Sequence, residues 1–404
     1  MSTSLLYHAF GVRGYEYHST QYRVGAVSQP RERLCCSVCC SVCGSARVFS
    51  KGRVSREFRA VPIGGKPVRV RLDVPRVRCR DCHLERQVAI PFAGPKKTYT
   101  HSFARYVLDL SQYMTIQGVA QHLGVSWDLV REIQQAHLQQ RYSKPKLKPL
   151  ERIAIDEIYV GKRYKFLTIV MDLDCGAIVF VGDGKGEQAL HPFWKRLRSS
   201  GAKIRAVAAD LSPAYSLAIR QNLPKATLVF DRFHLVKLLN EHLTELRREL
   251  QREAEDQLHK SVLKGTRWLL LKHPDRLDDT RNERQRLQDA LALNHSLATA
   301  YYLKEDLRQV WNQPVQVMGE WELDRWIRQA EVSGIRQLIK FAKTLRTHRA
   351  GILAWYDHPI STGPLEGTNN KIKLLQRQAY GYRDLDFFKL KLLALHRSRH
   401  ALVG

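Results

Sequence analysis

The spacing of hydrophobic residues changes several times along this chain of 404 residues. Hydrophobic and polar residues alternate over residues 56–79, which predicts short strands broken at Gly64, Gly65 and Pro75. Over residues 102–140 the hydrophobic residues recur every three to four positions, as is typical of helices. From residue 152 apolar strand-like runs alternate with helical stretches, and residues 232–358 form a long, charged helical pattern.

The region after residue 150 predicts a mixed sheet. Strand-like runs occupy residues 152–160, 165–172, 177–182, 204–210 and 226–231, and helical stretches occupy residues 187–199 and 214–222. The order of three strands, helix, strand, helix and strand is that of the ribonuclease H-like fold. A compact core of this kind does not need the helical residues 232–358, so we interpret them as an insertion. The fold class expected is therefore multidomain α/β.

These changes of pattern divide the chain into five expected parts. They are an N-terminal region with a zinc ribbon (1–95), a helix-turn-helix domain (100–145), the first part of a ribonuclease H-like core (150–231), a helical insertion (232–358) and a C-terminal helical region that completes the core (359–404).

The charge of the chain points to a polyanionic partner. The chain has 66 Lys and Arg against 39 Asp and Glu, a formal net charge of +27. Residues 1–105 hold 19 of these cations and 6 of these acids, about half of the excess in a quarter of the length. We therefore expect double-stranded DNA as partner, with phosphate contacts from the N-terminal quarter. The alternative is a merely basic solvated surface.

The cysteines indicate a metal site rather than disulfides. Seven of the eight cysteines lie in two short clusters, CCSVCCSVC at residues 35–43 and CRDC at residues 79–82. Two Cys-x-x-Cys pairs supply four thiolates with the spacing of a structural zinc site. The first pair has two possible frames, Cys36 with Cys39 or Cys40 with Cys43, and we favour the second because Gly44 follows it. The expected zinc ligands are Cys40, Cys43, Cys79 and Cys82.

The segment TIQGVAQHLGVSWDLVREI, residues 115–133, has the pattern of two short helices that turn at Gly124. Ser126 is expected to cap the second helix, and Trp127 and Arg131 near its start are expected to face the major groove. Simple packing of a helical hairpin is the alternative.

Three acids stand where a core would hold apolar residues. Asp156 lies within the strand-like run RIAIDEIYV, Asp210 ends the run IRAVAAD, and Glu366 begins a helix rich in cations and amides. Two divalent ions held by carboxylates catalyse phosphoryl transfer, and Mg²⁺ (or Mn²⁺) prefers such oxygen ligands. We therefore expect these three acids to be catalytic and to bind magnesium. On the Glu366 helix the expected DNA contacts are Asn370, Lys371, Lys373 and Arg377.

Other acids have competing explanations. Glu157 should point away from Asp156, because successive strand residues face opposite sides. Asp172 and Asp174 are interpreted as turn acids. Asp231 also ends an apolar strand, with His234 one turn later, so it remains open as a helix cap, a group beside the metal site, a substrate contact or a metal ligand.

In this order the motifs resemble the ISL3-type DDE transposases of bacterial insertion sequences. The resemblance rests on CSVCG with CRDC, GVAQHLGVSWDLV, AIDEIYV, AVAADLSPAY, VFDRFHLVK and GPLEGTNNKIKLLQRQAYGYRD, and it covers nearly the whole chain. It implies that Asp156, Asp210 and Glu366 form the catalytic triad. The doubled Cys-Ser-Val-Cys unit departs from the usual single pair.

The activity implied by the resemblance is cleavage at element ends followed by transfer of the 3′-hydroxyl into target DNA. The partners implied are terminal inverted repeats and target DNA, and we expect a homodimer because transposases act on paired ends. A ribonuclease H-like nuclease and a non-catalytic zinc-ribbon and helix-turn-helix regulator are the alternatives. No signal peptide or membrane-spanning run is visible, so we expect a cytoplasmic, nucleoid-associated bacterial protein.

Overall fold

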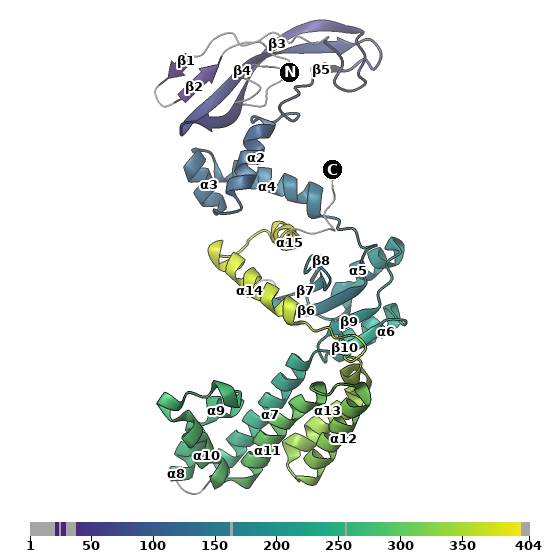
Figure 1. Cartoon of the computed structure of the whole chain (residues 1–404). Coiled ribbons are helices and arrows are strands. Elements are labelled where there is room, and N and C mark those ends of the chain that lie inside the picture. The colour runs from purple at the N-terminus through teal and green to yellow at the C-terminus, as the bar shows by residue number, and fades with distance from the viewer. Residues whose placement is uncertain (1–20, 24–25, 30–37, 162–164, 255–256, 397–404) are drawn as a thin grey trace. The chain divides into compact units, whose positions relative to one another are not determined.

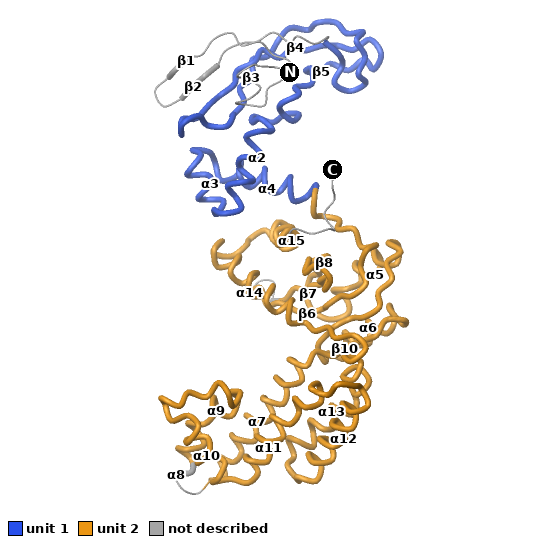
Figure 2. Tube along the Cα trace, in the orientation of Figure 1, with its two compact units in different colours: residues 1–140 blue, residues 141–404 orange. Residues whose placement is uncertain are grey.

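The computed structural model describes residues 21–23, 26–29, 38–161, 165–254 and 257–396. The chain separates into two compact units, residues 1–140 and residues 141–404 (Figure 2). Each unit has hydrophobic clusters of its own.

The first unit contains a five-stranded sheet dominated by a long antiparallel hairpin of β3 (Val48–Ile63) and β4 (Lys66–Cys79). The short strands β1 (Gln21–Arg23), β2 (Ala26–Gln29) and β5 (Glu85–Gln87) complete it. Gly64 and Gly65 make the hairpin turn with φ of 55° and 77°, values that favour glycine. Valine and leucine side chains on alternate β4 positions are buried, whereas the arginines between them are exposed.

The expectation of short strands broken at Pro75 was wrong. Pro75 lies within β4, opposite Arg53, next to a shift of register between Ser50 and Arg53 on β3. A bulge tolerates a proline because it leaves local ladder positions unpaired. The carbonyl of Pro75 accepts the N–H of Val88 at 3.1 Å, so the backbone there stays bonded on its other side.

Three helices follow the sheet: α2 (His101–Leu110), α3 (Ile116–Leu123) and α4 (Trp127–Tyr142). Thr100 and Thr115 cap the first two, each accepting a backbone N–H three residues later. Gly124 ends α3 in the left-handed conformation, at φ 59° and ψ 47°. The expected turn at Gly124 is thus confirmed, and the three helices bury one apolar cluster that includes Phe103, Val119 and Val130.

The second unit contains a mixed five-stranded sheet in the order β10-β9-β6-β7-β8 (Figure 1). Strands β6 (Arg152–Gly161), β7 (Lys165–Asp172) and β8 (Ile178–Asp183) are antiparallel neighbours. Strands β9 (Ala206–Ala209) and β10 (Thr227–Phe230) extend the other edge, parallel to β6 and to each other. The five predicted strands are confirmed, and each observed end lies within two residues of the predicted end. The observed β9 is shorter than the predicted strand 204–210 at both ends.

Helices cover both faces of this sheet. Ile153 and Ile155 of β6 pack with α5 (Glu187–Ser200) and α6 (Pro213–Asn222) on one face. Ala154 and Ile158 pack with α14 (Gly363–Gln378) and α15 (Leu385–Leu393) on the other face. Neighbouring positions of β6 therefore serve opposite faces, as the period of a strand requires.

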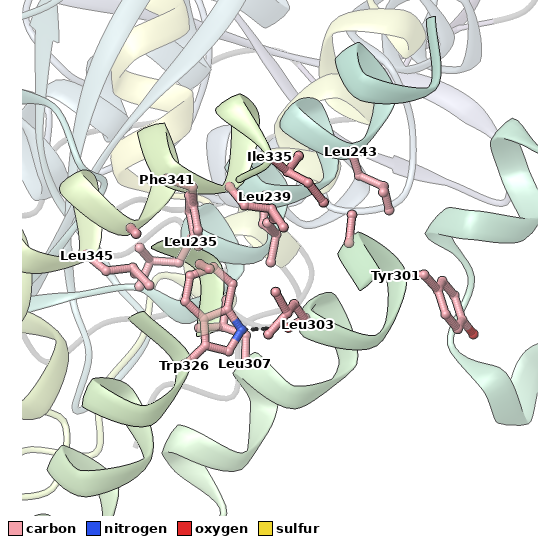
Figure 3. Close-up of a cluster of buried hydrophobic side chains, with 14 of the residues drawn as sticks. Leu235, Leu239, Leu243, Tyr301, Leu303, Leu307, Trp326, Ile335, Phe341 and Leu345 are labelled. Carbon is pink, nitrogen blue, oxygen red and sulfur yellow. Dashed lines mark hydrogen bonds between the residues drawn. The ribbon is translucent and has the colours of Figure 1, made fainter. Parts of the chain in front are cut away.

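The residues between β10 and α14 form a helical bundle with its own core (Figure 3). Leu235 and Leu239 on the first helix pack against Trp326 and Phe341, and the Trp326 indole N–H donates to the carbonyl of Leu303 at 2.6 Å. The helices are α7 (Arg232–Glu253), α8 (Gln257–Gly265), α9 (Arg267–Leu271), α10 (Glu283–Leu293), α11 (His295–Asp306), α12 (Gln316–Val332) and α13 (Arg336–Leu353). In the described ranges no helix has both the length and the apolarity to cross a membrane.

Candidate active site and zinc centre

Three aspartates meet at one edge of the mixed sheet because three parallel strands carry them there. Ile155 of β6 is paired with Ala209 of β9, and Ala209 is in turn paired with Phe230 of β10. The next residue on each strand is Asp156, Asp210 or Asp231. Parallel strands in register bring corresponding positions side by side, so the three acids form a row across β6, β9 and β10.

Asp156 is partly buried on the face of β6 that packs against α14. Its Oδ2 accepts a hydrogen bond from Asn369 Nδ2 at 3.0 Å, and its Oδ1 accepts the backbone N–H of Glu157 at 2.7 Å. Burial raises the pKa of Asp156 above its usual range and the nearby Asp210 charge raises it further, whereas the Glu157 N–H, His234 and Asn369 lower it. Burial and the neighbouring carboxylate both disfavour the charged form of Asp156, so a nearby cation would stabilise that charged form.

Asp210 lies just beyond β9 and is more accessible than the strand before it. Its Oδ1 accepts the backbone N–H of Ser212 at 3.0 Å. Ser212 directly precedes α6, so this bond fixes the carboxylate against the start of that helix. The structure therefore orients Asp210 through local backbone geometry and Asp156 through a contact from a distant helix.

Glu366 lies in the first turn of α14 and its side chain is exposed. The helix is anchored by Leu365 and Ile372, which are buried against the sheet face that carries Asp156. Glu366 precedes Asn369 by three residues, and such residues share one side of a helix. Since Asn369 bonds to Asp156, Glu366 projects from the turn of α14 that approaches the row of aspartates.

The three acids do not converge on a single point. Among the described residues, the potential ligand atoms of Asp156, Asp210 and Glu366 do not all lie within 4.8 Å of one another. Two metal ions about 3.5–4 Å apart do not require this, because outer ligands then bind different ions. In this structure the three acids therefore do not form one compact ligand cluster.

Asp231 is buried, and both of its carboxylate oxygens have protein partners. Oδ1 accepts the backbone N–H of Phe233 at 3.2 Å, which makes Asp231 the cap of α7. Oδ2 accepts the hydroxyl of Thr362, also buried, immediately before α14. Of the roles left open by the sequence, the helix cap is confirmed. The acid also ties the start of α14 to the end of β10.

The predicted DNA contacts of α14 lie along its accessible side. Asn370, Lys371, Lys373 and Arg377 are exposed. Lys371 Nζ lies 3.1 Å from His396 Nε2. Sequence reasoning named Asn370 but missed its neighbour Asn369, which is the asparagine that contacts Asp156. Thr362 was also missed. The sequence does not show that Thr362 and Asp231 are both buried and in contact at the start of α14.

The remaining acids behave as expected. Glu157 faces the other side of the sheet, where its Oε1 accepts the Tyr215 hydroxyl at 2.7 Å. Asp172 is the buried last residue of β7 and accepts the backbone N–H of Asp174, in the following turn, at 2.9 Å. Asp174 pairs with Arg152. These contacts confirm the interpretation of Glu157 and of the two turn acids.

In the first unit, Ser126 caps α4 by accepting the backbone N–H of Leu129 at 3.2 Å, as predicted. Trp127 is 43% exposed, and the Arg131 guanidinium lies 5.7 Å from its ring centroid. The two side chains therefore form an aromatic and cationic pair at the start of the second helix of the turn motif.

Four cysteines of the first unit form a compact cluster. The ligand atoms of Cys40, Cys43, Cys79 and Cys82 all lie within 4.8 Å of one another. The sulfurs of Cys40 and Cys82 are 3.6 Å apart, and those of Cys43 and Cys79 are 3.5 Å apart. Four thiolates at this spacing are the donor set of a structural tetrahedral zinc site.

The cluster uses the second of the two cysteine frames. Cys39 is exposed and outside the cluster, whereas Cys36 lies outside the described residues. Gly44, with φ 72°, turns the chain after Cys43. The backbone N–H groups of Cys43 and Val42 lower the pKa of Cys40 to about 6.

Three family models match successive parts of the chain. Residues 37–82 match the zinc-finger of transposase IS204/IS1001/IS1096/IS1165, and residues 88–138 match the helix-turn-helix domain of transposase family ISL3. Residues 153–392 match the ISL3 transposase model itself. The zinc-finger match and the four-cysteine cluster together support zinc as the metal of the first unit.

Two curated relatives cover most of the chain. It is 33% identical over 346 residues to the transposase for insertion sequence element IS1001 of Bordetella parapertussis, with 84% of each chain covered. It is 29% identical over 383 residues to the transposase for insertion sequence element IS1557 of Mycobacterium tuberculosis, with 88% of this chain and 85% of that chain covered. On the strength of the family models and these relatives, the chain belongs to the ISL3 family of transposases.

Proposed function

We propose that Asp156, Asp210 and Glu366 bind two Mg²⁺ ions (or Mn²⁺) and catalyse cleavage and joining of DNA at the ends of an insertion sequence. The observation that carries the proposal is the Asn369 to Asp156 hydrogen bond of 3.0 Å, which joins α14 to the row of strand-end aspartates. This bond supports the proposal because the turn of α14 that holds Glu366 lies next to Asp156, which is 210 residues earlier in the chain.

We propose further that the sheet of the second unit is a ribonuclease H-like core. The order β10-β9-β6-β7-β8, with β7 antiparallel to β6 and with β9 parallel to it, supports this assignment. On this view residues 150–231 and 359–404 form the core, and residues 232–358 are an insertion. Residues 1–95 and 100–145 are then the zinc ribbon region and the helix-turn-helix domain.

Bound magnesium would stabilise charge on the entering and leaving oxygens of the phosphodiester. The protein contributes the positions of the ligands. Asp156 is oriented by Asn369, Asp210 by the Ser212 N–H, and Glu366 by the burial of its helix. In the first step a water oxygen attacks phosphorus and loses a proton, and the 3′ oxygen leaves and is protonated to a hydroxyl. In the second step that 3′-hydroxyl loses its proton and attacks a phosphodiester of target DNA, whose own 3′ oxygen leaves and is protonated.

The first unit and α14 supply the proposed DNA contacts. The ribbon and the helix-turn-helix would recognise terminal inverted repeats, with Trp127 and Arg131 in the major groove and Ser126 fixing the start of the recognition helix. Lys371, Lys373 and Arg377 would hold the cleaved strand through its phosphates, with Asn370 beside them. Because two ends must be brought together, we propose a homodimer.

The test is a cleavage and joining assay on duplex DNA that carries the element's own end. Asp156→Asn, Asp210→Asn and Glu366→Gln should bind this duplex as wild type does but cut it at least a thousandfold more slowly in Mg²⁺. Glu187→Gln, at a half-exposed acid in the first turn of α5, is the matched control and should cut normally. Normal cutting by any triad variant would place the site elsewhere. Cutting by wild type without joined products would favour a nuclease.

A further inference from the structure

A groove runs along one side of α7 and is closed on one flank by α9. It has a volume of about 470 Å³, and its lining includes Phe233, Lys237 and Arg248 of α7 together with Arg267 of α9. From Phe233 to Arg248 the helix advances about 22 Å, at 1.5 Å per residue. The groove is therefore long enough to hold several consecutive units of an extended polymer.

The groove begins at the row of aspartates. Phe233, its first α7 residue, donates its backbone N–H to Asp231, which caps the helix at the end of β10. The next residue, His234, is near enough to Asp156 to lower the pKa of that carboxyl. The groove therefore starts within two residues of the acid that follows β10.

The charge of the lining suits phosphate. Lys237, Arg248 and Arg267 line the groove, against the single acid Glu241 among its lining residues. Lys237 and Arg248 are exposed and lie on the same side of α7, three turns apart. Spaced cations along a groove follow a phosphate backbone.

The lining also offers surface for bases. Phe233 is 47% exposed although it lines the groove. Next to the groove, Trp268 is 65% exposed, with the Arg267 guanidinium 4.7 Å from its ring centroid. Asn240, a lining residue, has a buried Oδ1 without a hydrogen-bond partner in the described parts of the chain.

We propose that this groove binds a single DNA strand leaving the active site, with its phosphates on Lys237 and Arg248 and unpaired bases on Phe233. Exposed aromatic rings stack on the free faces of unpaired bases. In a duplex those faces are covered by the adjacent base pairs. A single strand is therefore the occupant that uses both the cations and the ring. The direction of the strand rests on the proposed position of the catalytic acids, but its binding does not.

The test measures binding of a labelled thymidine 12-mer by full-length protein over a range of salt concentrations. Lys237→Ala with Arg248→Ala should weaken binding about tenfold or more and reduce the salt slope by about 1.4, because each lost phosphate contact on a single strand removes about 0.7. Phe233→Ala should also weaken binding about tenfold but leave the salt slope unchanged, since stacking releases no ions.

Lys340→Ala with Lys343→Ala is the matched control, because these exposed lysines of α13 remove the same charge outside the groove. It should bind the 12-mer as wild type does, and all variants should keep the wild-type melting temperature. Equal affinity and slope in the groove and control variants would overturn the proposal. The proposal would also be overturned if the groove variants lost as much affinity for a 12-base-pair duplex as for the single-stranded 12-mer. The 12-mer assay measures binding without cleavage, so a failure of the catalytic assignment is recorded separately by the cleavage assay of the triad variants.

Discussion

The cysteine cluster and the proposed catalytic acids of this transposase are built in opposite ways. The four cysteines come from two short knuckles, and their sulfurs lie within 4.8 Å of one another through local backbone turns. The proposed catalytic acids come from two strands and a helix, and the contact between Asp156 and Asn369 spans 213 residues of sequence. We expect the cysteine cluster to need bound zinc for cohesion, whereas hydrophobic packing positions the strands and the helix that carry the acids.

The largest expected effect tests the metal dependence of the first set. Cys79→Ser should release zinc and unfold the ribbon, because binding of a structural zinc contributes about 10 kcal/mol or more to folding. Residues 141–404 should keep their fold, since their cores contain no ribbon residue. Zinc content and limited proteolysis measure both outcomes. Cys39→Ser, at an exposed cysteine outside the cluster, should change neither.

The second prediction concerns the contact that orients Asp156. Asn369→Ala should lower cleavage about 10–100-fold, chiefly by raising the Mg²⁺ concentration needed for half-maximal rate, as for other groups that orient metal ligands. The protein should remain folded. Asn370→Ala is the matched control, because Asn370 is the exposed neighbour on the same helix. A similar shift in the Mg²⁺ dependence of both variants would contradict the specific role of Asn369.

The third prediction concerns the tie between the bundle and α14. Thr362→Val keeps the shape of the side chain but removes the hydroxyl that donates to the buried Asp231. The free energy of unfolding should fall by about 1–3 kcal/mol, the cost of an unsatisfied buried acceptor. Thr362→Ser should restore most of it. Denaturant unfolding of wild type and both variants measures these differences. Equal stability of Thr362→Val and wild type would show that the hydrogen bond contributes nothing.

The smallest effect follows from the raised pKa of Asp156. Burial favours the protonated carboxyl in the folded state, so the native protein binds more protons than the unfolded chain. This term therefore lowers the stability of the metal-free protein as the pH rises above the unfolded pKa of about 3.9. At pH 7, Asp156→Asn should raise the melting temperature by about 2–4 °C. The gain should vanish near pH 3, and a constant gain at both pH values would contradict the explanation.

The sequence predicted the strands of the second unit well because β6, β7 and β9 are buried on both faces and read as continuous apolar runs. It failed at Pro75, where register between two strands decides whether a proline is tolerated. It also selected Asn370 rather than Asn369, because helical spacing alone does not distinguish adjacent residues near one face. The Asp231 to Thr362 bond spans 131 residues, and no local pattern could have revealed it.

The most direct test of the account counts the metal ions held by the acids. Zinc-loaded protein with element-end duplex is titrated with Mn²⁺, and bound Mn²⁺ is measured by electron paramagnetic resonance. We predict two Mn²⁺ ions per chain with the magnetic coupling of neighbouring ions in wild type, and loss of the coupled pair in Asp156→Asn with zinc content unchanged. A coupled pair that persists in Asp156→Asn would show that these carboxylates are not its ligands.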